Sequence, residues 1–315
     1  MGGFRLIMCY KLLKSPIFYM GNKYKLLHQL LPLFPKNINT FYDLFGGSGC
    51  VSGNVNANTI IYNEINENIY DLFCMFERLG STNIIQAVEN NIERFGLNRE
   101  GTDIRQNIPN IKETREYYNK KYLDFRDYYN KHQDNITDLY TLTFYSFSNL
   151  IRFNSKSEFN MPYGNRCFCE KHKEQIIDWC DMLEHKNIIA FCSDYKNILE
   201  QYTPNKNDFI YVDPPYSSTL AIYNEKHAFG GWDIESDYDL FDILEDLDKK
   251  GIKWGMSNVF LNKGNVNQHL INWCEKNNWY VYHLNKTYSA LGKGNANSDE
   301  VYICNYLENK WEDLD

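Results

Sequence analysis

The chain has 315 residues, of which 43% are apolar, and a formal net charge of −8 at pH 7. This length is sufficient for one large domain or two ordinary domains with a substantial core. No apolar run approaches the length of a membrane span, and the stretch Phe4–Leu13 is too short for a signal peptide. The nine scattered cysteines fit a reducing environment better than a disulfide scaffold. We therefore expect a cytoplasmic protein that makes no contact with a membrane.

Charge is distributed unevenly along the chain. Residues 1–40 contain six lysines and arginines and no acidic residue, whereas residues 232–248 contain eight acidic residues and no basic one. The overall negative charge argues against a nucleic-acid partner, because binding to phosphates requires a basic surface. The uneven distribution allows one basic face on an otherwise acidic molecule, so the composition permits such a partner without requiring it.

The segment Lys14–Lys25 precedes a short helical pattern over residues 26–31, which two prolines end. Gly21 and Asn22 form a turn signal directly before this helix. Backbone amides at a helix N-terminus attract anions, and Lys23 adds positive charge. The segment is therefore a candidate for binding a ligand carboxylate.

The next predicted strand begins at Phe41 and leads into the glycine-rich loop Phe45–Gly49. Glycines let a backbone approach a ligand closely and adopt positive φ. Their spacing is not that of the dinucleotide-binding motif, which disfavours a nucleotide-dependent oxidoreductase. A second predicted strand over residues 60–64 ends in Glu64, whose carboxylate can accept hydrogen bonds from both hydroxyls of a ribose.

Residues 68–140 are helical and polar in character and contain no recognisable chemistry. Several tyrosines in this part are interleaved with basic residues and could stack on nucleic acid. Tyrosines at helical spacing more often belong to a core, and we expect core positions for these residues: Tyr117, Tyr118, Tyr122, Tyr128 and Tyr129.

Residues 145–166 are predicted to form a hairpin, because a turn cluster separates two short apolar segments. The hairpin would project Arg152 and Arg166, whose guanidinium groups suit the O6 and N7 atoms of guanine. Phe147 and Pro162 would project beside them as apolar wedges that can enter a base stack. Alternatively, both arginines bind only phosphates, because most protein–DNA hydrogen bonds go to the backbone.

Cysteines and a histidine follow the hairpin and raise the question of a zinc site. The spacing of Cys167 and Cys169 is shorter than in the usual structural zinc motif, and neither His172 nor Cys180 completes a second pair. We expect no metal at this position.

The C-terminal part alternates between strands and helices. Strands are predicted over residues 188–195, 252–258, 279–284 and 300–306, and helices over residues 174–183, 237–249 and 267–277. The first of these strands ends in Asp194 and Tyr195, a pair suited to the edge and the face of an adenine ring. The alternation implies a doubly wound α/β sheet, with the last two strands as an antiparallel pair at its edge.

The segment Asp208–Tyr216 reads as a buried strand that stops abruptly. Pro214 and Pro215 cannot continue a central strand, so Asp213 and Tyr216 project together just past its carboxyl end. In open α/β sheets this edge is where ligands bind. The motif is therefore the strongest candidate for the functional centre.

Three motifs carry a family resemblance: a Gly-Asn-Lys segment ending at Lys23, the pattern Asp-x-Phe-x-Gly-x-Gly over residues 43–49, and Asp-Pro-Pro-Tyr over residues 213–216. In this order they resemble the Dam-type, D12-class DNA adenine-N6 methyltransferases, the bacteriophage members in particular. The resemblance extends from Phe18 to Tyr306. It implies a mostly parallel, Rossmann-like methyltransferase sheet that binds S-adenosylmethionine, with an inserted helical and hairpin target-recognition domain. We expect residues 1–73 and 187–315 to form the catalytic domain and residues 74–186 to form the inserted domain.

The resemblance also assigns residues to the methyl donor. Tyr19 and Lys23 match positions that contact it, Asp43 would face the amino end of its methionine moiety, and the glycine amides would face the carboxylate. Glu64 stands where the family more often has Asp. The expected donor-binding residues are Tyr19, Gly21, Lys23, Asp43, Phe45, Gly46, Gly47, Ser48, Gly49, Glu64, Asp194 and Tyr195.

The catalytic residues implied by the resemblance are Asp213, Pro214 and Tyr216. The exocyclic amine of adenine is a poor nucleophile, because its lone pair is delocalised into the ring. The Asp213 carboxylate and the Pro214 carbonyl can accept its two N–H groups, while Tyr216 would stack on a base rotated out of the duplex. Positioning and electrostatics then drive methyl transfer without a metal.

In the resembling family the matching hairpin reads the target sequence, and here GATC is the expected target. Ser157 stands in its turn where the family usually has glycine. The expected DNA-binding residues are Phe147, Arg152, Asn154, Pro162 and Arg166. The expected partners are double-stranded DNA and a possible cognate restriction endonuclease, in a bacterial or phage-infected cell. The alternatives are an RNA adenine-N6 methyltransferase and a catalytically inactive, sequence-specific DNA-binding protein.

Overall fold

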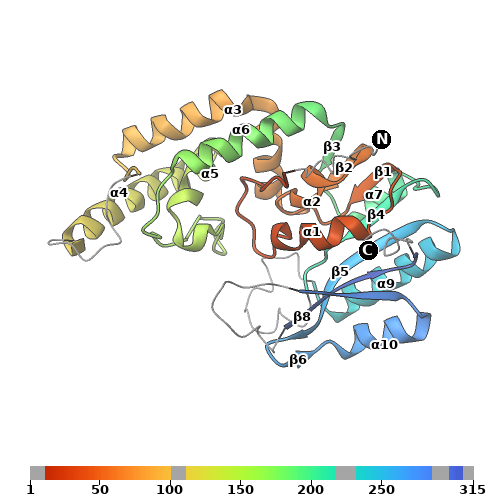
Figure 1. Ribbon diagram of the computed structural model, residues 1–315. Helices are drawn as coiled ribbons and strands as arrows, with labels where there is room; N and C mark the ends of the chain where they lie inside the picture. The colour runs from red at the N-terminus through yellow and green to blue at the C-terminus, as the bar shows by residue number, and fades with distance from the viewer. Residues whose placement is uncertain (1–10, 101–110, 217–231, 286–297, 308–315) are drawn as a thin grey trace, which may run out of the picture.

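The computed structural model describes residues 11–100, 111–216, 232–285 and 298–307 (Figure 1). Most of the apolar stretch Phe4–Leu13 lies outside these residues. An eight-stranded sheet with the order β3-β2-β1-β4-β5-β8-β7 forms the centre, and β6 pairs with β5. The strands are β1 Ile38–Asp43, β2 Ala57–Asn63, β3 Ile188–Phe191, β4 Phe209–Val212, β5 Lys253–Asn262, β6 Asn265–Val266, β7 Tyr280–Leu284 and β8 Ser298–Cys304.

The sheet is parallel from β3 to β5, and β8 pairs antiparallel with both β5 and β7. This confirms the predicted doubly wound, mostly parallel sheet and its late antiparallel pair. All four residues of β4 are buried, as expected for an apolar strand in the middle of a parallel sheet. The strand predicted over residues 188–195 is shorter than expected. It stops at Phe191, because the Asp194 side chain accepts a hydrogen bond from the Lys196 amide and caps the next helix.

Helices cover both faces of the sheet and also form a separate layer. The helices are η1 Tyr24–Leu26, α1 Leu27–Leu30, η2 Leu31–Leu33, α2 Cys50–Asn54, α3 Glu67–Phe95, α4 Ile111–Lys131, α5 Ile136–Tyr145, η3 Phe147–Asn149, α6 Glu170–His185, α7 Tyr195–Gln201, α9 Ile234–Lys249 and α10 Gln268–Asn277. On one face of the sheet, α1 and α2 pack against side chains such as Phe41 and Tyr211. On the other face, α9 and α10 pack against side chains such as Ile210 and Trp254. None of the helices in the described ranges is long and apolar enough to cross a membrane.

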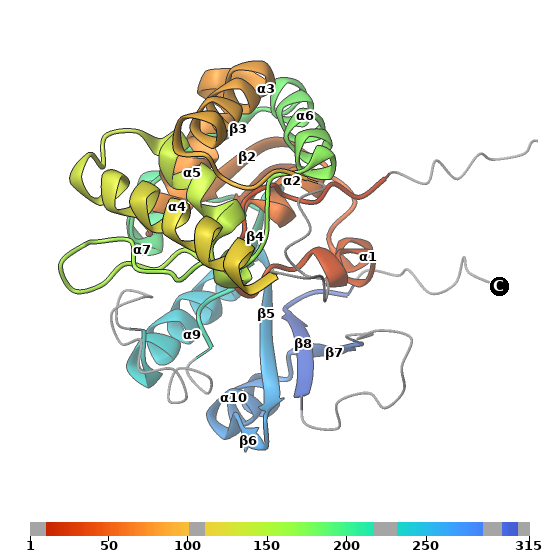
Figure 2. The same cartoon turned by 90° about the vertical axis from the view of Figure 1, so that its left-hand side faces the viewer.

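The helices α3, α4, α5 and α6 gather at one end of the molecule, away from β5, β8 and α10 (Figures 1 and 2). Their shared core contains large buried side chains, including Tyr122, Tyr140 and Trp179. Tyr122 and Tyr129 are core residues as expected, whereas Tyr117 is 56% exposed, so the expected core position is wrong for Tyr117. The proposed boundary after residue 73 falls inside α3, which kinks a little later at Gly80, where φ is +69°.

Candidate active site

The loop after β1 is shaped by close backbone packing. A Cβ atom at Gly46 would lie 2.2 Å from the ring of Tyr62, so any side chain there would displace this buried ring. Gly47 and Gly49 have φ values of +51° and +70°, which glycine adopts more easily than other residues. Gly49 begins α2. The sequence therefore forms a loop with little side-chain bulk at the carboxyl end of β1.

The carboxylate of Glu64 holds this loop in place. Its Oε2 atom accepts a hydrogen bond from the Gly47 amide at 2.9 Å, and its Oε1 atom accepts one from the Asn66 amide at 2.8 Å. Glu64 is only 5% exposed, and burial raises its pKa while the surrounding backbone amides oppose the rise. Each carboxylate oxygen has a second lone pair, so Glu64 can still accept hydroxyl groups from a ligand.

Asp43 is a second buried carboxylate, at the end of β1. Its Oδ2 atom accepts a hydrogen bond from the Ser52 hydroxyl at 2.6 Å, and the residue is 1% exposed. Burial is the main cause that raises the pKa of Asp43 to about 7. A cation that enters beside a carboxylate in such a site stabilises its charged form.

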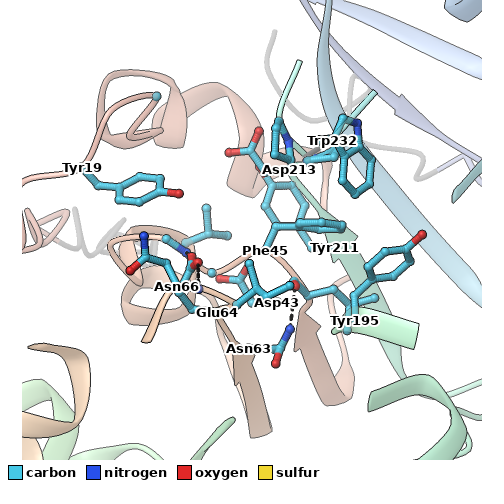
Figure 3. A pocket seen from close by; sticks show the side chains of 18 of the residues that line it. Tyr19, Asp43, Phe45, Asn63, Glu64, Asn66, Tyr195, Tyr211, Asp213 and Trp232 are labelled. Carbon is cyan, nitrogen blue, oxygen red and sulfur yellow. Dashed lines mark hydrogen bonds between the residues drawn. The ribbon is translucent and has the colours of Figure 1, made fainter. Parts of the chain in front are cut away.

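These groups surround a cavity of about 300 Å³ at the carboxyl ends of β1, β2 and β4. In Figure 3, Tyr19 lies on one side of the cavity and Tyr195 on the other, with the carboxylates of Asp43, Glu64 and Asp213 between them. The cavity is lined by every residue predicted for donor binding except Gly49, and also by Asp213, Pro214 and Tyr216. The structure therefore brings the predicted donor-binding and catalytic groups into one cavity.

One wall of the cavity is aromatic. The ring centroid of Phe45 lies 5.0 Å from that of Tyr195 and 5.4 Å from that of Trp232. The indole N–H of Trp232 donates to the Asp237 carboxylate at 2.8 Å, which fixes the orientation of the ring. This wall can pack against a flat, apolar ring such as a purine.

Asn63, Asn66 and Trp232 are among the lining residues that sequence reasoning missed. The Asn63 side chain donates to the carbonyl oxygens of Leu44 and Ser193, both at 3.0 Å, and so ties neighbouring loops together. Asn66 caps α3, and an Asn just before a helix is a signal that the sequence does contain. Trp232 belongs to no motif, so no local pattern identifies it.

Asp213, which also lines the cavity, makes two polar contacts. The ammonium group of Lys23 lies 2.6 Å from Oδ2 of Asp213, and the Tyr216 hydroxyl donates to Oδ1 at 3.2 Å. Burial is the largest influence on the pKa of Asp213 and raises it, while Lys23 opposes the rise. The Lys23 ammonium also donates to the carbonyl oxygen of Gly21 at 3.1 Å. Lys23 therefore connects the segment expected to bind the donor with the catalytic motif, a contact that the sequence did not predict.

The predicted recognition hairpin lies apart from the cavity, beside α4 and α5. Two antiparallel bridges, between Ser146 and Tyr163 and between Phe153 and Phe159, show the hairpin pairing. The Phe147 amide donates to the Pro162 carbonyl at 2.8 Å, and the Phe147 side chain is 57% exposed.

Polar side chains shape the turn of this hairpin. The Arg152 Nε atom donates to the Asn160 side chain at 2.8 Å. Asn154 accepts hydrogen bonds from the amides of Lys156 and Glu158, so its carboxamide oxygen organises the turn. Ser157 has a φ of +59°, so the turn keeps the left-handed conformation that glycine would favour.

The Cys169 Sγ atom lies 3.3 Å from the His172 Nδ1 atom beside the start of α6. Burial lowers the pKa of His172 to about 4. Within the described residues, no group of three or more His, Cys, Asp or Glu side chains is placed to hold a metal ion. The cysteine and histidine therefore form a local hydrogen-bonded pair at a helix end.

Known proteins resemble this chain along most of its length. The family model for the D12 class N6 adenine-specific DNA methyltransferases matches residues 19–291. The chain is 36% identical over 301 residues to the modification methylase StsI of Streptococcus sanguinis and 35% identical over 299 residues to the type II methyltransferase M.FokI of Planomicrobium okeanokoites. These alignments cover 94% and 93% of this chain but 43% of each relative, so the chain spans less than half of their length. The type II methyltransferase M1.LlaDCHI of Lactococcus lactis subsp. cremoris is 23% identical, with 91% of this chain and 94% of that protein aligned. The match over most of the chain shows that this protein belongs to the D12 class of N6 adenine-specific DNA methyltransferases.

Proposed function

We propose that this protein transfers a methyl group from S-adenosylmethionine to the N6 atom of an adenine in double-stranded DNA. The observation that carries the proposal is the placement of the Asp213-Pro-Pro-Tyr216 motif in the same cavity as the acidic and glycine-rich donor groups. A methyl transfer requires the acceptor amine and the donor sulfonium to meet in line, which a single shared cavity permits. The methyl donor supplies an electrophilic methyl group when it is bound.

The residues of the cavity fit such a donor. Asp43 is a buried carboxylate suited to an ammonium group, because a nearby cation offsets the cost of burying its charge. Glu64 has lone pairs for the ribose hydroxyls, and the aromatic wall of Phe45, Tyr195 and Trp232 suits the adenine ring. The glycine-rich loop lines the same cavity and would face the methionine moiety.

In the same cavity, the Asp213 side chain and the Pro214 carbonyl would accept the two N–H groups of the target amine. Accepting both favours a pyramidal nitrogen whose lone pair points at the methyl group. The target base must leave the duplex to reach this position, which costs roughly a few kcal/mol. The ring of Tyr216 would offset part of this cost by stacking on the base.

We also propose that the hairpin reads DNA through Phe147, Arg152, Asn154, Pro162 and Arg166, with GATC as the target. The exposed Phe147 lies beside Pro162 and suits insertion into a base stack, while the two arginines are exposed on the same hairpin. The relatives bear the names of modification methylases, which supports a cognate restriction endonuclease as a partner in the bacterial or phage-infected cytoplasm.

The proposal is tested by incubating the protein with labelled S-adenosylmethionine and either duplex DNA or RNA of matched sequence. We expect label in the DNA alone, and no label when Asp213 is replaced by alanine. Label in the RNA alone would support an RNA methyltransferase. Binding to DNA without transfer by the wild-type protein would support an inactive DNA-binding protein.

A further inference from the structure

The region around Arg166 contains a short backbone segment in an unusual conformation. Ser148 and Asn149 both have a φ of +57°, although neither is glycine. Left-handed backbone is uncommon for such residues, and asparagine tolerates it better than most. Strained backbone persists only where surrounding contacts hold it, and it concentrates at functional sites. Asn149 is also buried, with 5% of its surface exposed.

The carboxamide of Asn149 connects the end of α5 to Arg166. Its nitrogen donates to the carbonyl oxygens of Thr143 at 2.9 Å and Phe144 at 3.4 Å, two residues in the last turn of α5. Its oxygen accepts a hydrogen bond from the Arg166 guanidinium at 2.5 Å. The left-handed conformation at Asn149 thus accompanies contacts in both directions, toward a rigid helix and toward an exposed arginine.

The backbone of Arg166 is held as well. The Asn98 side chain donates to the Arg166 carbonyl oxygen at 3.0 Å and accepts a hydrogen bond from the Tyr163 hydroxyl at 2.6 Å. Next to this contact, a Cβ atom at Gly164 would lie 2.3 Å from the carbonyl oxygen of Ser146, so the two arms of the hairpin touch through their backbones. Hydrogen bonds therefore hold both parts of Arg166: Asn98 contacts its backbone carbonyl, and Asn149 contacts its guanidinium group.

We propose that Asn149 is a positioning residue for target choice, which acts by fixing the guanidinium group of Arg166 toward the DNA. This inference rests on the proposed role of Arg166 as a reader of a base. A guanidinium group has five N–H donors, and Asn149 occupies one of them, which leaves donors for a bidentate contact with guanine. A long side chain without such support loses more conformational freedom on binding, so its contact discriminates less between bases.

The test replaces Asn149 with glycine, which adopts a positive φ without strain and removes only the carboxamide. Ser148→Gly is the matched control, because it relaxes the neighbouring left-handed residue and leaves the contact with Arg166 intact. Methylation rates are measured on the site found by sequencing and on sites that differ from it by one base pair. Donor binding, which uses the distant cavity, is measured by calorimetry to show that each variant is folded.

We expect Arg166→Ala to relax selectivity at one base pair by at least about fivefold, as for the loss of a bidentate contact. Asn149→Gly should relax selectivity at the same base pair by at least about threefold, and Ser148→Gly should not. In the Arg166→Ala background, Asn149→Gly should produce no further relaxation. If the glycine variant fails to bind the donor, Asn149→Ala serves in its place with the same expected result.

Three outcomes would each overturn one of these claims. If Arg166→Ala lowers the rate equally on all sites and reduces the salt dependence of binding, Arg166 binds phosphate, and the base-reading part of the proposed function is wrong. If Arg166→Ala relaxes one position but Asn149→Gly leaves that position unchanged, Arg166 reads the base and the role of Asn149 is wrong. Relaxation by Asn149→Gly at a different base pair would also contradict its action through Arg166.

Discussion

The ammonium group of Lys23 lies 2.6 Å from the carboxylate of Asp213, although 190 residues separate the two in sequence. Lys23 precedes the first helix, and Asp213 follows β4 directly. The ammonium group opposes the rise in the pKa of Asp213 that burial causes. The ion pair therefore favours the charged form of Asp213.

Replacement of Asp213 with alanine should reduce the rate of methylation by at least about 10²- to 10³-fold, because a positioned electrostatic partner of the reacting amine is lost. Donor affinity, measured by calorimetry, should stay largely unchanged, since the donor groups of Asp43 and Glu64 are untouched. Near-normal turnover by this variant would show that Asp213 is not a catalytic residue.

Replacement of Lys23 with methionine should move the acid limb of the pH–rate profile to higher pH. Burial raises the pKa of Asp213, and Lys23 lowers it, so removal of the ammonium raises this pKa further. Asp213 must be ionised to accept N–H groups, and activity falls as the pH drops through its pKa. The profile of kcat against pH, measured at saturating donor, reports the shift. The Lys23→Arg variant is the control that keeps the charge, and equal acid limbs in the methionine and arginine variants would show that the charge does not act on Asp213.

Replacement of Asp43 with asparagine should weaken donor binding and stabilise the protein when no donor is bound. The pKa of Asp43 is about 7 in the folded protein, above its ordinary value of 3.8. The folded state therefore binds this proton more tightly, and its contribution to the free energy of unfolding is present below pH 3.8 and is lost as the pH rises through about 7. In this window the difference between the variant and the wild type should grow by up to about 1.4 kcal/mol per pH unit.

Thermal unfolding of the two proteins at several pH values, with and without donor, measures this difference. Bound donor should reverse the order, because its ammonium group stabilises the charged form of Asp43. An unfolding temperature that depends on pH in the same way in both proteins would show that Asp43 does not titrate in this window.

Replacement of Glu64 with alanine should weaken donor binding with the fold retained. The substitution removes the acceptor for the Gly47 and Asn66 amides as well as the proposed acceptor for the ribose hydroxyls. A lost hydrogen bond to a charged group is worth roughly 1.5–3 kcal/mol, or about 10- to 150-fold in affinity. Calorimetry with S-adenosylmethionine measures the change, and an unchanged affinity would place the ribose elsewhere.

The sequence predicted those parts of the site in which one short segment contains both the end of a strand and the polar side chain that follows it. The glycine loop with Asp43 and the Asp213-Pro-Pro segment each combine an apolar strand, a break and a polar side chain within a few residues. The carboxyl ends of parallel strands share one edge of the sheet, so the sequence alone predicts that two such segments lie close together. The antiparallel pairing of β7 with β8 at the edge of the sheet was also predicted from local patterns, whereas their order was not.

The parts that the sequence did not predict depend on contacts between distant segments. The ion pair of Lys23 with Asp213 and the position of Trp232 beside Phe45 require the packed tertiary structure. Asn154 begins the turn cluster of the predicted hairpin and is also one of the expected DNA-binding residues. Its residue type suited contact with DNA, but in the structure its carboxamide oxygen organises the turn by accepting two backbone amides. Asparagine serves both purposes, and only the geometry shows which contacts it makes in the free protein.

The central claim is that this cavity directs a methyl group onto the N6 atom of adenine in DNA. The most direct measurement digests duplex DNA to nucleosides after incubation with isotopically labelled S-adenosylmethionine and identifies the labelled nucleoside by mass spectrometry, with sequencing to locate it. We predict labelled N6-methyldeoxyadenosine, placed at GATC, and no labelled nucleoside with the Asp213→Ala variant. Label on cytosine, on another atom of adenine, or at equal levels with the Asp213→Ala variant would contradict the account.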